Sequence, residues 1–173
     1  DGHDLGKGNE EFMKAEVDDY EELVEEAAEV LERWPDKVMI PEDVVLNVDG
    51  EREGESLEKL PSEYPIFDIG LDTMTEYAGV IDEAELVILN GPAGAFEIEE
   101  FSIGTTELFR SIAHTDAFSI IGGGHSTAVV EQLDLESSID HISTGGGSCI
   151  SFLAGKEMPG LEALKKSKEI FKK

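Results

Sequence analysis

The sequence has only one cysteine, Cys149, and no long run of apolar residues. A single cysteine excludes an internal disulfide framework and a four-cysteine zinc site. The longest apolar runs, such as residues 86–89, fall far short of the roughly 18 to 20 residues that a membrane-spanning helix needs. The first residues have neither a positively charged leader nor an apolar stretch, so we expect no signal peptide. These absences predict a soluble, cytoplasmic protein that makes no membrane contact.

Basic residues are also scarce, and the shortage is uneven along the chain. There are 40 acidic residues against 13 basic ones, which gives a net charge of −27. Residues 1–100 carry 31 acidic and 6 basic side chains, whereas residues 101–173 carry 9 and 7. A field of this sign repels nucleic acids and anionic membranes, so neither is expected as a partner. The nearly neutral last part tolerates an anionic ligand better than the first part does.

The acidic excess has two interpretations. One is a binding surface for calcium or for a basic partner. The other is a solvated surface that keeps a protein soluble in high salt, where screening weakens the self-repulsion of the charges. The acidic residues are dispersed, and no Asp-x-Asp-x-Asp-Gly calcium loop is present. We therefore favour a salt-adapted surface and a halophilic source.

The composition is that of a globular α/β protein. Hydrophobic residues make up 40 % of the 173 residues, which suits one domain over residues 1–173. Periodicity predicts helices over 18–34, 71–81, 105–113, 128–133 and 161–171, and a further helix from Cys149. Apolar runs predict strands at 37–40, 44–48, 86–89, 118–121 and 141–143, with loops at 1–12 and 49–65 and a turn at 68–70. Trp34 is expected in the core. The alternation of strands and helices predicts a doubly wound, mostly parallel sheet of the Rossmann-like, three-layer kind.

Three of these strands end in glycine-rich loops, at residues 90–94, 122–124 and 145–147. Ligands of open α/β sheets bind outside the carboxyl ends of the strands. Glycines let a phosphate approach the backbone, and the free N–H groups at a helix start favour negative charge. Glycine turns also serve ordinary strand-to-helix connections, but three in succession favour a site for a polyphosphate. The two common nucleotide motifs, G-x-G-x-x-G and G-x-x-x-x-G-K-[ST], are absent.

Other candidate residues have competing structural explanations. Cys149 beside a glycine turn, with His141 upstream, could be a thiol nucleophile, but a small buried apolar residue is the simpler role. Glu97 could accept hydrogen bonds from ribose hydroxyls, or it could belong to a charged face with the acidic residues that follow it. The four histidines lack the spacing of a metal motif, and only His125 lies in a glycine loop.

Several segments resemble the phosphoglycerate kinase family. Asn90-Gly91-Pro92-Ala93-Gly94-Ala95-Phe96-Glu97, followed by Phe101 and Gly104-Thr105, is similar to the family segment N-G-P-x-G-x-F-E…F…G-T. Ser119-Ile120-Ile121-Gly122-Gly123-Gly124 is similar to the next strand and loop of the family. The segments 141–148 and 152–164 resemble its C-terminal signature. The resemblance is strong over residues 67–164, and Asp4-Leu5-Gly6-Lys7-Gly8 fits a loop of the second domain.

The resemblance implies a two-lobed, monomeric glycolytic kinase that moves a phosphoryl group between 1,3-bisphosphoglycerate and ADP with Mg²⁺. It implies that this chain is a partial domain, part of the C-terminal lobe that binds ATP or ADP. The cleft that binds the nucleotide would be lined by Asn90, Gly91, Pro92, Gly94 and Ala95. Glu97 would hold the ribose. The phosphates would be surrounded by Gly122, Gly123, Gly124, His125, Ser126 and Thr127. The catalytic N–H groups would be those of Gly145, Gly146 and Gly147, which act by positioning and charge stabilisation.

The chain departs from the family pattern in two ways. His125 stands where the family usually has an aspartate that assists the metal-bound nucleotide, so no metal ligand is assigned. The chain is also less than half the usual length and lacks the N-terminal lobe that binds phosphoglycerate, so we expect it to need that missing part for activity. Two other hypotheses stay open: a non-enzymatic nucleotide-binding module and an acidic protein-interaction module. Saturable ADP binding would exclude the interaction module, and turnover restored by the missing part would exclude a purely regulatory role.

Overall fold

The polypeptide divides by its internal contacts into two compact units. The structure, a computed structural model, describes residues 2–171. The first unit comprises the residues up to 80 together with 93–108, and the second comprises 81–92 and the residues from 109 onward. Each unit has its own three-stranded sheet. The assignment of residues 1–173 to one domain of a larger enzyme stays a prediction.

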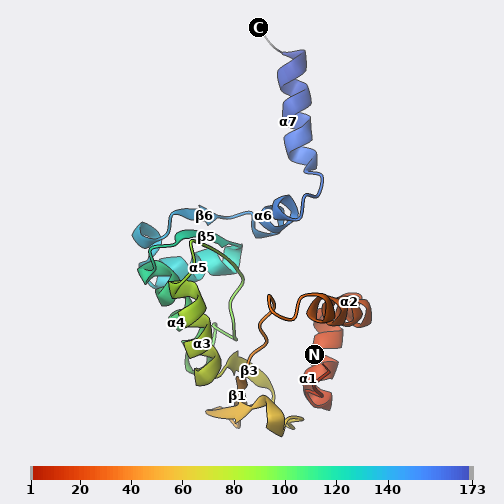
Figure 1. Cartoon of the computed structure of the whole chain (residues 1–173), viewed down its shortest axis with the longest axis vertical. Coiled ribbons are helices and arrows are strands. Elements are labelled where there is room, and N and C mark those ends of the chain that lie inside the picture. Colours follow the sequence, from red (N-terminus) through yellow and green to blue (C-terminus); the bar gives the residue numbers. More distant parts are fainter. Residues whose placement is uncertain (1, 172–173) are drawn as a thin grey trace. The chain divides into compact units, whose positions relative to one another are not determined.

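The first unit is built on a small antiparallel sheet. Its strands are β1 (Asp43–Val48), β2 (Glu51–Ser56) and β3 (Ile66–Ile69), in the order β2-β1-β3. Helices α1 (Lys7–Glu16) and α2 (Tyr20–Arg33) precede the sheet, and the unit also holds the one-turn helices η1 (Leu57–Lys59) and η2 (Glu99–Phe101) (Figure 1). Val44, Val45 and Leu46 of the central strand are buried, as are Ile69 and Phe101. These side chains form the core of the unit.

A two-residue turn, Asp49-Gly50, joins β1 to β2. Both residues have a positive φ, 54° and 98°, as the tight hairpin turn requires, and Asp-Gly is a favoured pair for it. The loop predicted over 49–65 is therefore wrong, because β2 and η1 occupy most of its first half. An Asp-Gly pair directly after an apolar strand is the signal that indicates such a hairpin.

Three other predictions for this unit are wrong. Residues 1–12 are not all loop, since α1 begins at Lys7. Residues 37–40 form no strand, because Pro35 and Pro41 flank the segment and each lacks the N–H donor that pairing to a neighbouring strand needs. The turn expected at 68–70 is absent, because Asp68 and Ile69 are the last residues of β3.

The amphipathic helix expected over 18–34 is present as α2, but it buries none of its residues. Leu23 and Val24 on its apolar face are 47 % and 49 % exposed, so this face is only partly covered. Trp34 is not in the core, contrary to expectation. It is 39 % exposed, and the Arg33 guanidinium lies over its ring, 4.5 Å from the ring centroid.

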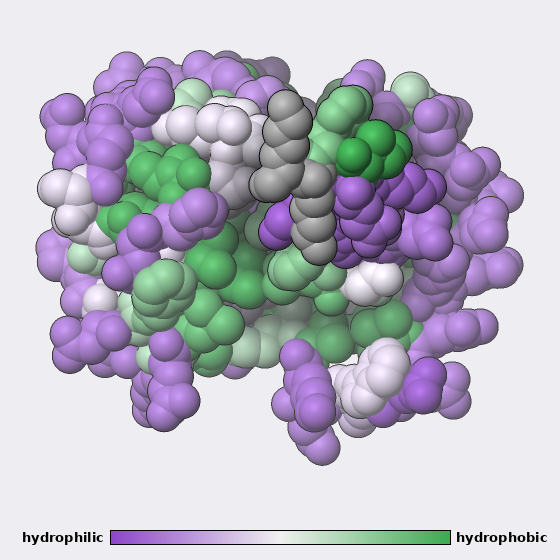
Figure 2. Space-filling view, turned by 90° about the horizontal axis from the view of Figure 1, so that it is seen from above, coloured by the Kyte–Doolittle hydropathy of each residue, from purple (hydrophilic) through white to green (hydrophobic). Residues whose placement is uncertain are grey.

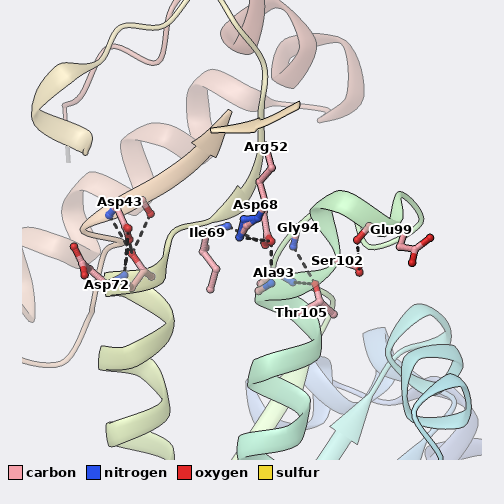
Figure 3. Close-up of polar contacts among 12 residues, drawn as sticks. Asp43, Arg52, Asp68, Ile69, Asp72, Ala93, Gly94, Glu99, Ser102 and Thr105 are labelled. Atoms are coloured by element: carbon pink, nitrogen blue, oxygen red, sulfur yellow. Dashed lines mark hydrogen bonds and ion pairs between the residues drawn. The ribbon is translucent and has the colours of Figure 1, made fainter. Parts of the chain in front are cut away.

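Asp43 at the start of β1 holds the first turn of α3 (Leu71–Asp82). Its Oδ1 accepts hydrogen bonds from the backbone N–H and the hydroxyl of Thr73, at 2.9 and 2.7 Å, and its Oδ2 accepts from the N–H of Asp72 at 3.2 Å (Figure 3). Burial alone would raise the pKa of Asp43, but these hydrogen bonds stabilise the carboxylate and lower its pKa. A Cβ on Gly70 would collide with the Asp43 carboxyl group, so this contact requires glycine there.

The second unit contains the parallel sheet predicted from the alternation of strands and helices. Its strands β4 (Leu86–Asn90), β5 (Phe118–Gly122) and β6 (His141–Ser143) lie in that order. The helices that follow are α4 (Ile103–His114, shared with the first unit), α5 (Gly124–Gln132), the one-turn η3 (Glu136–Ser138), α6 (Gly146–Leu153) and α7 (Pro159–Ile170). Both α5 and α6 contact β5. Phe109, Ile121 and Val130 are fully buried between these elements.

The predicted α/β fold with a parallel sheet is thereby confirmed, and the antiparallel sheet of the first unit adds to it. The helices α5 and α6 begin earlier than expected, at Gly124 and Gly146. Within residues 2–171, no helix combines the length and the apolar character needed to cross a membrane.

Candidate functional site

The three glycine loops of the second unit follow strands that end at the same edge of the sheet. Asn90 pairs with Gly122, and Gly122 pairs with Ser143, in the parallel register of β4, β5 and β6. The loops therefore leave the sheet side by side, as expected for the carboxyl ends of parallel strands. We call this edge, formed by Asn90–Pro92, Gly122–Gly124 and Gly145–Gly147, the glycine rim.

Close packing explains some glycines of the rim. A Cβ on Gly146 would lie 2.6 Å from the Cα of Gly123 and 2.7 Å from Oδ1 of Asn90. A Cβ on Gly122 would lie 3.3 Å from the same Asn90 oxygen. The backbones of two loops thus approach each other around the Asn90 amide. A side chain at residue 146 would force them apart.

Packing does not explain Gly124 and Gly147. Both are exposed, and a Cβ at either position would meet nothing within 4 Å. They lie in the first turns of α5 and α6, where backbone N–H groups have no intrahelical partner. The N-cap residues, Gly123 and Gly145, supply no side-chain hydrogen bond. Two helix N-termini without a capping side chain therefore lie at one edge of a sheet. The N-terminus of a helix favours an anion.

The three residues that follow Gly124 have different environments. Ser126 is fully buried, and its hydroxyl accepts a hydrogen bond from the N–H of Gly91 at 2.9 Å. This bond ties the first glycine loop to α5. Thr127 donates its hydroxyl proton to the carbonyl of Gly123 at 3.0 Å, so that proton is already used within the helix. His125 is exposed at the rim.

The other predicted nucleotide residues, Gly94, Ala95 and Glu97, belong to the first unit. The N–H of Ala95 donates to the carbonyl of Phe67 at 2.7 Å, which ties the segment to β3. A Cβ on Gly94 would lie 2.5 Å from Oδ1 of Asp68 and 2.7 Å from the Phe67 carbonyl oxygen. This close approach requires a glycine. Glu97 is exposed.

Asp68 is the buried centre of this part of the first unit. It is 3 % exposed, and its carboxylate accepts from the N–H of Gly104 at 2.8 Å and from that of Ile69 at 2.9 Å (Figure 3). The Arg52 guanidinium lies 3.4 Å from Oδ2. Burial raises the pKa of Asp68, and the hydrogen bonds and the charge of Arg52 offset this only in part.

Neither Asp68 nor Thr105 was predicted from the sequence to have a role in the site. A single acidic residue inside the apolar strand segment Ile66–Ile69 is a signal for a buried, partnered carboxylate. Thr105 belongs to the Gly104-Thr105 pair that resembles the family segment, but its residue type does not indicate its two partners, which are backbone groups of a loop 11 and 12 residues away.

A cavity of about 820 Å³ lies in the first unit, beside the segment that contains Gly94 and Ala95. Its lining is mainly apolar and includes Phe12, Val44, Ile66, Phe67, Ala95 and Ile98. Its volume lies within the range of about 300 to 1,000 Å³ that is typical of small-molecule sites, and such sites are mostly lined by apolar side chains.

Cys149 and the histidines add no second site. Cys149 is half-buried and forms no disulfide, so it is less buried than the small buried apolar residue that was expected. His141 is exposed at the start of β6. Within the part of the chain that the structure describes, no three His, Cys, Asp or Glu residues come together as a metal site.

Comparison with known proteins gives a consistent result. A family model described as phosphoglycerate kinase matches residues 1–156. A protein named phosphoglycerate kinase from Thermoplasma acidophilum is 46 % identical over 170 residues, which are 98 % of this chain and 41 % of that protein. A protein of the same name from Methanosarcina mazei is 47 % identical over 165 residues, which are 95 % of this chain and 39 % of that protein.

Solved structures agree with these relatives. The crystal structure of a phosphoglycerate kinase from Pyrococcus horikoshii is similar with a TM-score of 0.88 and 41 % sequence identity. The match covers 98 % of this chain and 42 % of that one. The chain thus spans about two fifths of the length of the relatives that it matches.

Proposed function

The chain belongs to the phosphoglycerate kinase family, and we propose that it supplies part of the C-terminal, nucleotide-binding lobe of such an enzyme. The reaction would move a phosphoryl group between 1,3-bisphosphoglycerate and ADP in the cytoplasm, with the enzyme working as a monomer. The glycine rim is the observation that supports this proposal, because two helix N-termini without capping side chains and three glycine loops lie at one edge of a parallel sheet. The phosphoglycerate site would lie in the remaining three fifths of the enzyme.

The glycine rim is proposed to bind the phosphates. Gly122, Gly123 and Gly124, with the start of α5, would cradle the nucleotide phosphates, and His125 would lie beside them. The N–H groups of Gly145, Gly146 and Gly147 would point to the phosphoryl group in transfer. Phosphoryl transfer needs little covalent chemistry from the protein, so fixed N–H dipoles can contribute by positioning the group and stabilising its charge. These dipoles also offset the overall negative field of the chain.

The segment from Asn90 to Glu97 is proposed to bind the nucleoside. Asn90, Gly91 and Pro92 would continue from the phosphates, and Gly94 and Ala95 form part of the wall of the apolar cavity. The Glu97 carboxylate, two residues beyond Ala95 and exposed to solvent, would accept hydrogen bonds from the ribose hydroxyls.

Mg²⁺ is proposed to enter with the nucleotide. The described residues form no metal cluster, and His125 offers a ring nitrogen where Mg²⁺ prefers oxygen. The donor set of this chain therefore does not fit a resident Mg²⁺ site. The phosphate oxygens of ADP or ATP would hold the ion, and no step of the reaction is assigned to a metal ligand in this chain.

Titration with ADP tests the proposal. We expect saturable binding of ADP to the 173-residue chain by isothermal titration calorimetry, and no turnover by the chain alone. Adding the part of the Thermoplasma acidophilum enzyme that the chain does not cover is expected to restore turnover. Absence of ADP binding would contradict the nucleotide role, and binding without restored turnover would favour a regulatory module.

Glu97→Gln separates ribose binding from surface charge. The substitution keeps the shape of the side chain but weakens a charge-assisted hydrogen bond, so we expect ADP affinity to fall by about 1 to 3 kcal/mol. Glu100→Gln, at an exposed residue of η2, is the matched control and should change the affinity little. Removal of a negative charge by itself strengthens binding of an anion, so tighter or equal ADP binding by both variants would rule out the ribose role.

The acidic surface is proposed to be an adaptation to high salt, and hence the mark of a halophilic source. Hydrophilic residues border the face that Figure 2 presents, around hydrophobic residues in its middle, and the net charge is −27. We expect the midpoint of thermal unfolding to rise by about 5 to 10 °C between about 0.1 and 3 M KCl, because screening relieves the self-repulsion. Circular dichroism measures this midpoint. An unchanged value in molar salt would remove the argument for salt adaptation.

A further inference from the structure

Thr105 lies in the first turn of α4 and is 1 % exposed. Its hydroxyl oxygen accepts two hydrogen bonds, from the N–H of Ala93 at 3.1 Å and from the N–H of Gly94 at 3.2 Å (Figure 3). Figure 3 shows the side chain directed from the helix toward the loop. One buried oxygen thus accepts hydrogen bonds from two consecutive backbone N–H groups of the segment from Asn90 to Glu97, which is proposed to bind the nucleoside and is called the nucleoside segment below.

The next donor of the loop is also held from outside. The N–H of Ala95 bonds to the Phe67 carbonyl of β3, so three consecutive N–H groups have partners on neighbouring elements. The course of residues 93–95 is therefore set by the positions of α4 and β3. An unpaired N–H group in a buried place is costly, so the loop has a strong preference for the conformation that keeps these bonds.

The start of α4 is itself fixed to β3. The N–H of Gly104, next to Thr105, donates to the buried carboxylate of Asp68 at 2.8 Å. A Cβ on Gly104 would collide with that carboxylate, so glycine allows the helix start to approach β3 closely. Thr105 therefore projects from a helix turn whose place is fixed by Asp68.

We propose that Thr105 is a positioning residue for recognition of the nucleoside, an inference that rests on the nucleotide-binding function proposed above. Thr105 touches neither base nor ribose. It holds Ala93 and Gly94 so that Ala95 forms the wall of the apolar cavity and the chain continues to Glu97 at the right place. The phosphate contacts proposed for the glycine rim do not depend on it.

The Thr105→Val variant tests the inference. Valine has the shape of threonine but offers no acceptor, so the N–H groups of Ala93 and Gly94 lose their partner. We expect the Kd for ADP to rise about tenfold, and the Kd for inorganic pyrophosphate, which lacks a nucleoside, to change less than about twofold. Calorimetry measures the first constant and ³¹P NMR the second. Thr105→Ser keeps the hydroxyl and should restore ADP binding to within about threefold of the unaltered chain.

A matched control is Thr106→Val, which makes the same change at the neighbouring, half-buried residue of α4 and should leave both constants unchanged. Equal losses of ADP and pyrophosphate binding in Thr105→Val would assign Thr105 to general stability and overturn the inference. Unchanged ADP binding in Thr105→Val would also overturn it. If the unaltered chain binds pyrophosphate but not ADP, the nucleotide function itself fails, and the inference fails with it.

Discussion

Gly146→Ala is expected to destabilise the chain by about 3 kcal/mol, because an added methyl group in a closely packed place must push its neighbours aside. The new Cβ would lie 2.6 Å from the Cα and 2.7 Å from the N of Gly123. These are backbone atoms, which cannot move away as the end of a flexible side chain can. Relief therefore requires the loops after β5 and β6 to separate, which distorts the glycine rim. Urea unfolding at neutral pH measures the loss of stability.

Gly147→Ala is the matched control for Gly146→Ala. It adds the same methyl group one residue later in α6, where a Cβ meets nothing within 4 Å. Alanine is a better helix former than glycine, so the control should be neutral or stabilising by up to about 1 kcal/mol. Similar losses in both variants would show that helix α6, and not the approach of two loops, determines the effect.

Asp68→Ala is expected to destabilise the chain by about 2 to 4 kcal/mol, since it removes one partner of a buried ion pair. The N–H groups of Gly104 and Ile69 lose their acceptor, and the Arg52 guanidinium loses its carboxylate. Thermal and urea unfolding of the variant measure the effect.

Asp68→Asn distinguishes the hydrogen bonds from the charge. The amide oxygen can still accept from one backbone N–H, and the buried negative charge is gone. We therefore expect a smaller loss, about 1 to 2 kcal/mol. If alanine and asparagine destabilise equally, the charge of Asp68 is the only feature that matters. If neither variant changes the stability by as much as about 1 kcal/mol, the carboxylate does not organise this unit.

The second unit was largely predictable from sequence because its signals are local. Residues 86–89 and 118–121 are short, mainly apolar runs, and each is followed at once by a glycine-rich loop. A short apolar run bounded by turn residues is typical of a buried strand. The parallel arrangement then places all three glycine loops at one edge, so the candidate phosphate site follows from the order of the elements. The register of Asn90, Gly122 and Ser143 agrees with that expectation.

The first unit was less predictable because contacts distant in sequence decide it. The strand β2 (Glu51–Ser56) is mostly polar, so its place in the sheet depends on pairing with β1 and on the Asp49-Gly50 turn. Trp34 has a large apolar side chain of the kind usually found in a core, yet it lies at the exposed C-terminal end of α2. The contact between Asp68 and Gly104 joins residues 36 positions apart, and no spacing rule indicates it. The residues that shape the nucleoside segment were missed for the same reason.

The two carboxylates that organise the first unit exchange protons in opposite directions on unfolding. Burial tends to raise the pKa of Asp43, but its hydrogen bonds hold the pKa below the ordinary 3.8, so its stabilising effect is present above pH 3.8 and is lost as the pH falls through the lower folded value. Burial raises the pKa of Asp68 above 3.8, so its ionised form opposes folding above that raised value, and the opposition is relieved as the pH falls toward 3.8. Unfolding therefore takes up a proton at Asp43 just below pH 3.8 and releases one from Asp68 just above it. Around this pH the two carboxylates therefore contribute with opposite signs to the number of protons taken up on unfolding.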